Sequence, residues 1–505
     1  MPDIKDDALG PSTGWYATIS RARWAWLLAA LVSSLAVADP QEPVITRHQI
    51  QSGGRALGYT AEVGRIAIRD VETGQPHGHM FYTAYRAPGK TSRPVTFIWN
   101  GGPGADSALL HFSVAGPKLL RNAHLVDNPD TWLAASDLVM VDPIGTGFSR
   151  PVSSNYDSEF YSTRGDVASV TEFVRSWLLL HDAEDAPVFL VGESWGAGRA
   201  ASVGYALESR AIRVNGLVLI SGGWGLNKSY GSAALRDALR VVDMASTALF
   251  YGKTPPDLGK DPAAVRQAAE QWVRDTYAPA LARRDQLTDS ERTSLANELA
   301  RFTGIPADKI DRQTLVISPR QFREDLLKSE AKRPYIFDLR ISSSEPPRSH
   351  AAILHYFRHD LGYQTDLPYI GLEDVTQGFA PSGKYPESVN ERWNYATKDV
   401  TPEEMKAAIE AAAKEGGGPP RIGPPLPATQ EAIAINPDLK VLVAAGMYDG
   451  FQPCASGAQT EADLPQNLRA AITFKCYVGG HAMYLDDPAR VQLSRDVKTL
   501  ISGAH

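Results

Sequence analysis

A serine lies where a catalytic nucleophile is expected, within residues 191–198. An apolar run precedes this stretch, and residues 199–208 follow it with a helical pattern. Gly192 and Gly196 sit two residues either side of Ser194, where a sharp turn from strand to helix leaves no room for side chains. The pattern predicts a nucleophile elbow that presents the Ser194 hydroxyl for attack on an acyl carbon.

A serine hydroxyl becomes nucleophilic when a base takes its proton, and the base needs a third group to orient it. In open α/β hydrolases the acid and then the histidine follow the serine along the chain, each past the end of a strand. Residues 439–446 have the pattern of a buried strand and lead to Asp449, and residues 473–478 lead in the same way to His481. Either residue alone could be a turn residue or a surface side chain. Their order and setting predict a triad of Ser194, Asp449 and His481.

A glycine-rich loop, residues 100–104, follows a third apolar strand at residues 95–99. Glycines allow backbone N–H groups to point into a cavity, where they can stabilise the oxyanion of a tetrahedral intermediate. The natural donors are the N–H of Gly102 and that of Trp195, the residue after the nucleophile. An ordinary surface loop is the alternative, but the strand that leads into the loop favours an oxyanion hole.

Together these motifs resemble those of the serine carboxypeptidase family (peptidase family S10). The residues that carry the resemblance are 100–104 with Ser107, Gly116-Pro117, 142–149, 192–196 and the surroundings of Asp449 and His481. The similarity runs from about residue 60 to the C-terminus and weakens between about residues 226 and 430. Residues 125–129 and 479–481 look most like the bacterial branch of the family.

The resemblance implies the same triad and oxyanion donors, and it adds a substrate-binding group. Asn100, Gly101 and Glu193 match residues that bind the terminal carboxylate of a peptide. In the family, the glutamate before the nucleophile shares a proton with a second glutamate, which favours acidic pH. In this chain Val114 occupies the position of that second glutamate.

The substitution leaves the hydrolase chemistry intact but alters the expected carboxylate site. Glu193 could be neutralised by burial, or it could stay ionised and reject carboxylates. His111, one helical turn before Val114, could offer a cation or be merely solvated. The expected activity is release of a C-terminal amino acid from a peptide. A serine esterase or acyltransferase on the same scaffold is the alternative, and an inactive hydrolase kept for binding is a third interpretation.

The elements that must position these residues alternate along the chain. Residues 59–87 contain alternating and aromatic segments typical of antiparallel strands. Apolar strands then alternate with helical stretches, at residues 95–99, 138–141, 188–191 and 216–221. This rhythm predicts a mostly parallel sheet with helices on both faces, which is the α/β-hydrolase fold that the resemblance implies.

The core is expected in two parts, residues 39–225 and 436–505, with a largely helical cap inserted at residues 226–435. Within the insertion, residues 263–276 and 290–302 are long, charged helical stretches. Residues 416–427 are rich in proline and glycine and predict a flexible return connection. Such a cap would lie over the carboxyl ends of the strands and shape the substrate pocket.

Residues 1–38 have the pattern of a secretory signal peptide with an unusually long, acidic leader. Arg21 and Arg23 precede an apolar run at residues 24–37, and residues 36–38 offer small side chains for cleavage. An uncleaved anchor is the alternative, and a misassigned start codon would explain the leader. We expect export to the periplasm or the extracellular space of a bacterium, with no stable membrane association after cleavage.

Cys454 and Cys476 are the two cysteines of the chain. They lie five residues after Asp449 and five residues before His481, so a bridge between them could tie the two triad loops together. In an exported protein an even pair is typical of one disulfide, and two free buried thiols are the alternative.

Composition and the remaining histidines limit other functions. The chain has 505 residues, is 43% hydrophobic and carries a net charge of −7 without a basic cluster, which argues against nucleic-acid binding. His77 and His79 lack a nearby thiol or carboxylate, and His355 and His359 lack the glutamate of a zinc-binding helix. We therefore expect no metal and no cofactor. The expected partner is a peptide or ester substrate, and the oligomeric state stays open.

Overall fold

The computed structural model describes residues 42–89, 93–342, 351–371, 389–414, 422 and 428–503. The predicted signal peptide, residues 1–38, lies outside the described residues. So does the predicted return connection, residues 416–427, apart from Ile422.

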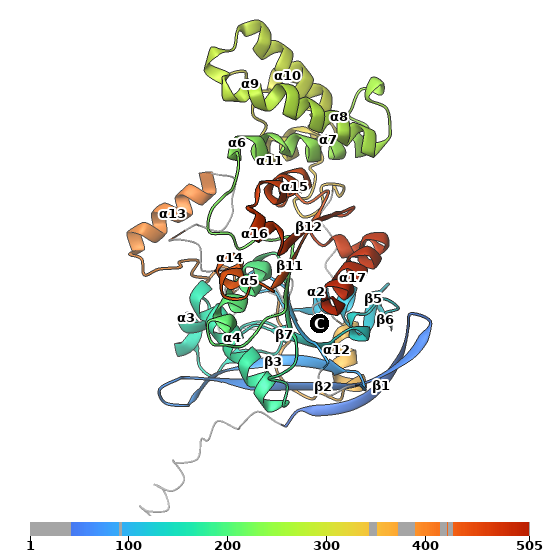
Figure 1. Cartoon of the computed structure of the whole chain (residues 1–505), viewed down its shortest axis with the longest axis vertical. Coiled ribbons are helices and arrows are strands. Elements are labelled where there is room, and N and C mark those ends of the chain that lie inside the picture. The colour runs from blue at the N-terminus through green and yellow to red at the C-terminus, as the bar shows by residue number, and fades with distance from the viewer. Residues whose placement is uncertain are drawn as a thin grey trace, which may run out of the picture. The chain divides into compact units, whose positions relative to one another are not determined.

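A ten-stranded sheet runs through the core in the order β1-β2-β3-β7-β4-β9-β10-β11-β12, with β8 paired to β3 (Figure 1). The strands are β1 (Val44–Ser52), β2 (Arg55–Arg69), β3 (Pro76–Arg86), β4 (Val95–Trp99), β7 (Asp137–Asp142), β8 (Arg150–Pro151), β9 (Val188–Glu193), β10 (Gly216–Ile220), β11 (Lys440–Gly446) and β12 (Ile472–Tyr477). The first three strands are antiparallel to one another and β3 is antiparallel to β7, whereas all pairs from β7 to β12 are parallel. The predicted leading antiparallel strands and parallel sheet are both confirmed.

Helices cover both faces of this sheet, and each face has its own apolar cluster. Along β4, Phe97 and Trp99 belong to one cluster and Ile98 to the other, as the alternation of side chains in a strand requires. The first face is covered by α4 (Thr163–Leu180), α5 (Trp195–Glu208) and α14 (Thr429–Ile435), and the second by α12 (Ala351–His355) and α17 (Asp487–Ser502). Because both faces are buried, the parallel strands are continuous apolar runs. This architecture is the predicted α/β-hydrolase fold.

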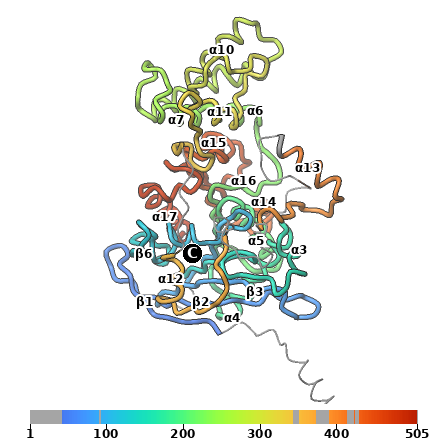
Figure 2. The backbone as a smooth tube through the Cα atoms, turned by 180° about the vertical axis from the view of Figure 1, so that it is seen from behind, coloured from blue at the N-terminus to red at the C-terminus, as the bar shows by residue number. Residues whose placement is uncertain are grey.

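Helices between β10 and β11 form a third apolar cluster of their own. They are α6 (Ala233–Ala238), α7 (Arg240–Phe250), α8 (Pro262–Trp272), α9 (Ala278–Ala282), α10 (Asp289–Thr303) and α11 (Pro319–Asp325). In both views α7, α10 and α11 lie beyond α15 (Cys454–Asp463), away from β2 and β3 (Figures 1 and 2). These helices fall inside the predicted insertion, residues 226–435, whose boundaries stay a prediction.

Smaller elements complete the described chain. They are the strands β5 (Lys118–Arg121) and β6 (His124–Asp127), which form a separate two-stranded sheet, and the helices α2 (Ala108–Leu110), α3 (Asp157–Phe160), α13 (Pro402–Lys414) and α16 (Gln466–Arg469). Within the ranges that the structure describes, no helix has both the length and the apolar character needed to span a bilayer.

Candidate active site

Ser194 lies at the junction of β9 and α5, with φ 57° and ψ −124°. A serine with positive φ is strained, as expected at the turn of a nucleophile elbow. The Ser194 N–H donates to the Ile220 carbonyl at 2.8 Å, which ties the turn to the neighbouring strand β10. A Cβ on Gly192 would lie 1.8 Å from the Gly196 carbonyl oxygen, so this turn can form only with glycine at position 192.

His481 and Asp449 lie in the loops that follow β12 and β11, and their side chains are in contact. Nδ1 of His481 is 2.8 Å from Oδ2 of Asp449, and Oδ1 of Asp449 accepts the Phe451 N–H at 2.8 Å. The other ring nitrogen, Nε2, is buried and has no hydrogen-bond partner among the described residues. His481 and Ser194 line the same cavity, the candidate catalytic cavity, although no hydrogen bond joins Nε2 to the Ser194 hydroxyl in the described chain.

The electrostatic surroundings of His481 favour its protonated form. Burial by itself lowers the pKa of the imidazole, but the charge of Asp449 and its hydrogen bond outweigh this effect. Glu193 adds a smaller contribution of the same sign, so the pKa of His481 is raised above its ordinary value. A base with this shift can hold a proton taken from serine and return it to a leaving group.

The glycine-rich loop after β4 lies directly against the elbow. A Cβ on Gly101 would be 2.5 Å from the Glu193 carbonyl oxygen and 2.6 Å from the Trp195 nitrogen. Gly102 has φ +99°, a conformation that favours glycine. Across the described chain, neither the Gly102 N–H nor the Trp195 N–H donates a hydrogen bond to a protein acceptor. The pair therefore has the free donors that an oxyanion hole requires.

Glu193 is buried next to Ser194 and accepts hydrogen bonds from two side chains. The Tyr484 hydroxyl donates to its Oε2 at 2.8 Å, and the Asn100 amide donates to the same oxygen. Oδ1 of Asn100 in turn accepts the Leu110 N–H at 3.0 Å. The sequence analysis missed Tyr484, because no motif indicates a tyrosine that meets Glu193 only through the fold of the loop after His481.

Val114 and His111 do not take part in this arrangement. Val114 is fully buried in the second apolar cluster and does not line the catalytic cavity. His111 is also buried, with Nε2 2.7 Å from the Tyr85 hydroxyl, and burial lowers its pKa to about 3. Both interpretations of His111, as a cation for the substrate and as a solvated side chain, are therefore wrong. The sequence could not show that its helical turn faces the core.

The catalytic cavity has a volume of about 800 Å³ and is largely apolar. Residues that precede β10, residues between β10 and β11, and residues that follow β12 all contribute to its walls. The apolar walls consist of Leu109, Phe112, Leu120, Phe250, Tyr335, Phe337, Ile341, Ile353 and Leu485. The charged side chains beside the catalytic residues are Asp106, Arg121, Asp338, Arg340 and Asp486. A cavity of this size is typical of a small-molecule binding site.

A short segment between α11 and the core, residues 336–339, is bonded to both triad loops; we call it the strap. The Gly450 N–H donates to the Ile336 carbonyl at 3.0 Å, and the Leu339 N–H donates to the Tyr448 carbonyl at 2.9 Å. The His481 N–H donates to the Phe337 carbonyl at 2.6 Å. The Phe337 ring lies 5.1 Å from the imidazole of His481, centre to centre. The strap therefore links the loops of Asp449 and His481 to one another through its backbone.

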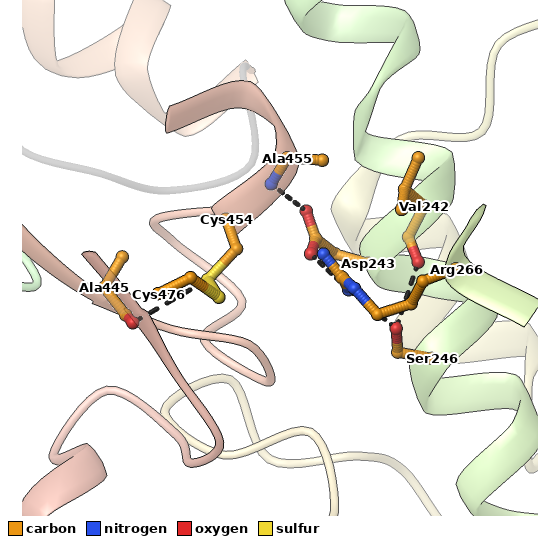
Figure 3. The surroundings of a disulfide bond; sticks show 8 residues. All are labelled: Val242, Asp243, Ser246, Arg266, Ala445, Cys454, Ala455 and Cys476. Carbon is orange, nitrogen blue, oxygen red and sulfur yellow. Dashed lines mark hydrogen bonds and ion pairs between the residues drawn. A yellow bond between two sulfur atoms is a disulfide. The ribbon is translucent and has the colours of Figure 1, made fainter. Parts of the chain in front are cut away.

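A disulfide links Cys454, at the start of α15, to Cys476 in β12, with the two Cα atoms 5.7 Å apart (Figure 3). The Ala455 N–H beside it donates to Asp243 of α7 at 3.2 Å. Asp243, which is buried, also forms an ion pair with the partly buried Arg266 of α8 at 2.9 Å. The bridge thus joins the chain that follows Asp449 to the strand that leads to His481, and the helical region is anchored next to it.

The remaining histidines have other neighbours. Nδ1 of His77 is 2.9 Å from Oε2 of Glu159, and the rings of His355 and His359 lie 4.3 Å apart. Within the described ranges, no three or more histidine, cysteine, aspartate or glutamate side chains are grouped as a metal site would require.

Comparison with known proteins points to one family. Residues 68–203 match the family model described as serine carboxypeptidase. A pheromone-processing carboxypeptidase KEX1 of Arthroderma otae is 30% identical over 227 residues, which cover 42% of this chain and 34% of that protein. Serine carboxypeptidase-like 47 of Arabidopsis thaliana is 30% identical over 143 residues, which cover 27% of this chain and 26% of that protein.

The chain spans about a third or less of the length of these curated relatives. Both come from eukaryotes, a fungus and a plant, so they do not support the predicted bacterial branch. Among solved structures, a lipase in an open form covers 88% of this chain and 99% of its own, at 15% identity and a TM-score of 0.35. The fold assignment rests on the strand order instead.

Proposed function

We propose that this chain is a hydrolase that releases the C-terminal residue of peptides, because residues 68–203 match the family model described as serine carboxypeptidase. The proposal covers the whole reaction, whereas the family match covers the part of the chain that carries the elbow and the glycine-rich loop. The relatives named as carboxypeptidases support a peptide substrate for the same chemistry.

In the proposed reaction, Ser194 attacks the carbonyl carbon of the last peptide bond. Nε2 of His481 takes the serine proton and then protonates the leaving amine, while Asp449 orients the ring and stabilises its charged form. The N–H groups of Gly102 and Trp195 stabilise the oxyanion. Water, activated by the same histidine, then hydrolyses the acyl-enzyme.

One observation carries this proposal above the others. The orienting contact, 2.8 Å between Asp449 and His481, leaves a buried Nε2 without a partner in the cavity that contains Ser194. An unpaired buried polar atom costs about 1–3 kcal/mol, so a partner for Nε2 during the reaction would offset this cost. The unpaired nitrogen is explained if its partner is the serine proton.

Substrate binding is proposed for Asn100, Gly101 and Glu193. Asn100 and Glu193 are bonded to one another at the cavity wall, and Tyr484 is the additional hydrogen-bond partner of the carboxyl group. For an exopeptidase, Glu193 must carry a proton when it meets the terminal carboxylate of the substrate. We propose that Tyr484 supports this site in place of the missing second glutamate.

An esterase or acyltransferase is the second candidate, and the position of Val114 favours it. Val114 is buried in the core, so the cavity wall beside Glu193 has no second carboxyl from this position. An ester substrate carries no terminal anion and needs no carboxylate site. The apolar walls of the cavity suit an acyl chain as well as a peptide side chain.

We also propose that the chain is exported by a bacterium and that residues 1–38 are its signal peptide. The disulfide supports this location, because disulfides persist in oxidising compartments. Fractionation followed by N-terminal sequencing tests it. A mature chain that begins near Asp39 in the periplasm or the medium is expected, and a cytoplasmic chain with its leader would refute it.

The substrate class is tested with three matched compounds and the purified protein. A blocked dipeptide with a free C-terminal carboxylate is compared with its C-terminal amide and with a simple ester. Strong preference for the free acid is expected, and it should be lost in Asn100→Ala and Tyr484→Phe. Hydrolysis of the ester alone would refute the carboxypeptidase and support the esterase.

A further inference from the structure

Two buried carboxyl groups lie close to the glycine-rich loop, residues 100–104, which we also call the oxyanion loop. The reaction described above does not use them. Asp106 follows the glycine-rich loop, and Asp142 is the last residue of β7. Both are buried, with 9% and 4% of their surfaces exposed. Asp106 also lines the catalytic cavity, together with Gly102 and Ser194.

Hydrogen bonds connect the two carboxyl groups to the backbone of Ser107 and Ala108, just after the glycine-rich loop, and to one hydroxyl. Oδ1 of Asp142 accepts the Ser107 N–H at 2.8 Å, and Oδ1 of Asp106 accepts the Ala108 N–H at 2.8 Å. The Tyr369 hydroxyl lies 3.3 Å from Oδ1 of Asp106 and also interacts with Asp142. The two carboxyl groups therefore share one phenol and fix the backbone at the end of the loop.

Packing around the pair leaves little room for rearrangement. A Cβ on Gly147 would lie 1.8 Å from Oδ2 of Asp142, and a Cβ on Gly371 would lie 2.0 Å from Oδ2 of Asp106. Glycines at both positions are what allow the backbone to close over the carboxyl oxygens. Solvation of two full negative charges would require this packing to open.

Few charged side chains lie close to the carboxyl groups of Asp106 and Asp142. Arg150 is a nearby cation, but the hydrogen bonds that it makes go to the carbonyls of Gly147, Ser149 and Pro368. Burial, and then the charge of Asp106, raises the pKa of Asp142 to about 7. The other charged or titratable side chains of the cavity are Arg121, Glu193, Asp338, Arg340, His481 and Asp486.

We propose that Asp106 and Asp142 hold a single proton between them and are positioning residues for the oxyanion loop. The inference rests on the proposed hydrolase function. With one proton, the pair carries one negative charge and keeps Ser107 and Ala108 in place. When that proton is lost, two buried charges repel one another beside Gly102. The added negative charge also opposes the oxyanion that forms in the transition state, so the reaction slows.

The expected pH dependence is a bell with two separate causes. His481 must lose its proton to act as a base, which gives the rise on the acid side. The pair must keep its proton, which gives the fall on the alkaline side. Neither the acid limb nor the alkaline limb depends on a pair of glutamates like that of the family, because Val114 occupies the position of the second glutamate.

The rate at which an organophosphonate labels Ser194, measured from about pH 5 to about pH 9, tests the inference without knowledge of the natural substrate. In the wild type the rate should fall about tenfold per pH unit above the alkaline pKa. Asp142→Asn and Asp106→Asn keep a hydrogen-bond acceptor but lose the shared proton. In both, the alkaline fall should disappear or move up by at least about one pH unit.

Tyr369→Phe keeps both carboxyl groups and serves if the asparagine variants fail to fold. The Tyr369 hydroxyl lowers the pKa of Asp142, so its removal should move the alkaline limb to higher pH. Asp137→Asn is the matched control, because Asp137 is a buried carboxylate at the other end of β7, paired with Arg93. Asp137→Asn should reduce stability and leave the pH dependence of the labelling rate unchanged.

The outcomes separate this inference from the proposed function. If folded wild-type protein is not labelled at Ser194, the hydrolase proposal fails, and this inference fails with it. If the wild type is labelled and the alkaline limb is unchanged in the Asp142, Asp106 and Tyr369 variants, the hydrolase stands and the proton-sharing pair is refuted. A uniform loss of rate at every pH also refutes it, because that is the result of a purely structural role.

Discussion

The parallel sheet and the strap reach the catalytic cavity through different kinds of contact. On the side of the sheet, backbone meets backbone: the loop at Gly101 and the turn at Gly196 lie so close that a methyl group fits at neither. On the side of the strap, three backbone hydrogen bonds hold the loops of Asp449 and His481. Close packing of glycines leaves a trace in the sequence, whereas backbone hydrogen bonds can be made by any residue except proline as donor. The candidate catalytic residues can thus be recognised from sequence motifs, whereas the backbone contacts that align them cannot.

The largest expected effect belongs to the side of the sheet. Ser194→Ala removes the nucleophile and should lower kcat/KM by at least about 10⁴-fold, with little change in thermal stability. Ser202→Ala is the matched control, since Ser202 is a buried serine further along the same helix, α5. Substantial activity in Ser194→Ala would show that the elbow is not the reactive centre. The comparison between sheet and strap would then no longer concern the catalytic residues.

The anchor between α7 and α15 should matter for stability rather than for chemistry. Asp243→Asn breaks the ion pair between buried Asp243 and partly buried Arg266 and weakens the bond to Ala455, so it should cost about 3 kcal/mol of the free energy of unfolding. Chemical denaturation measures this change. Organophosphonate labelling of the folded variant should stay within about twofold of the wild type.

A matched control for that variant is Asp237→Asn, an exposed carboxylate of α6 that lies 3.7 Å from Arg240. Its effect should not exceed about 0.5 kcal/mol. Equal destabilisation by the two substitutions would contradict the anchor. A large loss of labelling in folded Asp243→Asn protein would show that the helical region controls the chemistry more directly than proposed.

The strap should have a moderate effect on turnover. Phe337→Ala removes the ring that packs against His481 and should lower kcat/KM about tenfold, because the imidazole becomes freer to move. Burial lowers the pKa of His481, so its exposure to water should move the acid limb to higher pH. A pH–rate profile measures both changes. Phe337→Leu keeps much of the apolar cover, so its kcat/KM and acid limb should lie between those of the wild type and of Phe337→Ala. An unchanged pH–rate profile in both variants would show that the strap has no role in turnover.

The smallest effect is expected from the charge beside the triad. The Glu193 charge contributes to the raised pKa of His481, so Glu193→Gln should lower that pKa and move the acid limb to lower pH by less than about one unit. The base is active when neutral, and the rate at a given acidic pH should therefore rise relative to the plateau. The ester substrate is the appropriate probe, because it needs no carboxylate site. A shift in the opposite direction would contradict the electrostatic assignment.

Much of the fold could be predicted because a buried parallel strand is an apolar run with turn residues at its end. The strand expected at residues 95–99 is β4 (Val95–Trp99), and that expected at 188–191 is the main part of β9 (Val188–Glu193). The prediction of Asp449 and His481 followed from the same logic, since each comes directly after such a strand. The structure brings the two side chains together, and their catalytic role stays a proposal.

Other parts of the site could not be predicted, for physical reasons. The strap carries no motif, and its bonds use the backbone alone. Tyr484 meets Glu193 only through the fold of the loop after His481. For His111 the sequence pattern indicated a helical position but not which face is buried, and both interpretations of this residue were wrong. Burial and long-range contact are tertiary properties, so a single sequence indicates them poorly.

The central claim is that Ser194 is made reactive by a buried imidazole with one free nitrogen. Peptide mapping after reaction with an organophosphonate tests it most directly, with wild-type protein and His481→Ala side by side. The account predicts a single adduct on Ser194, formed at a rate that rises on the acid side through a pKa above the ordinary value for histidine and that collapses in His481→Ala. An adduct at another residue, or equal labelling of Ser194 in the two proteins, would contradict it.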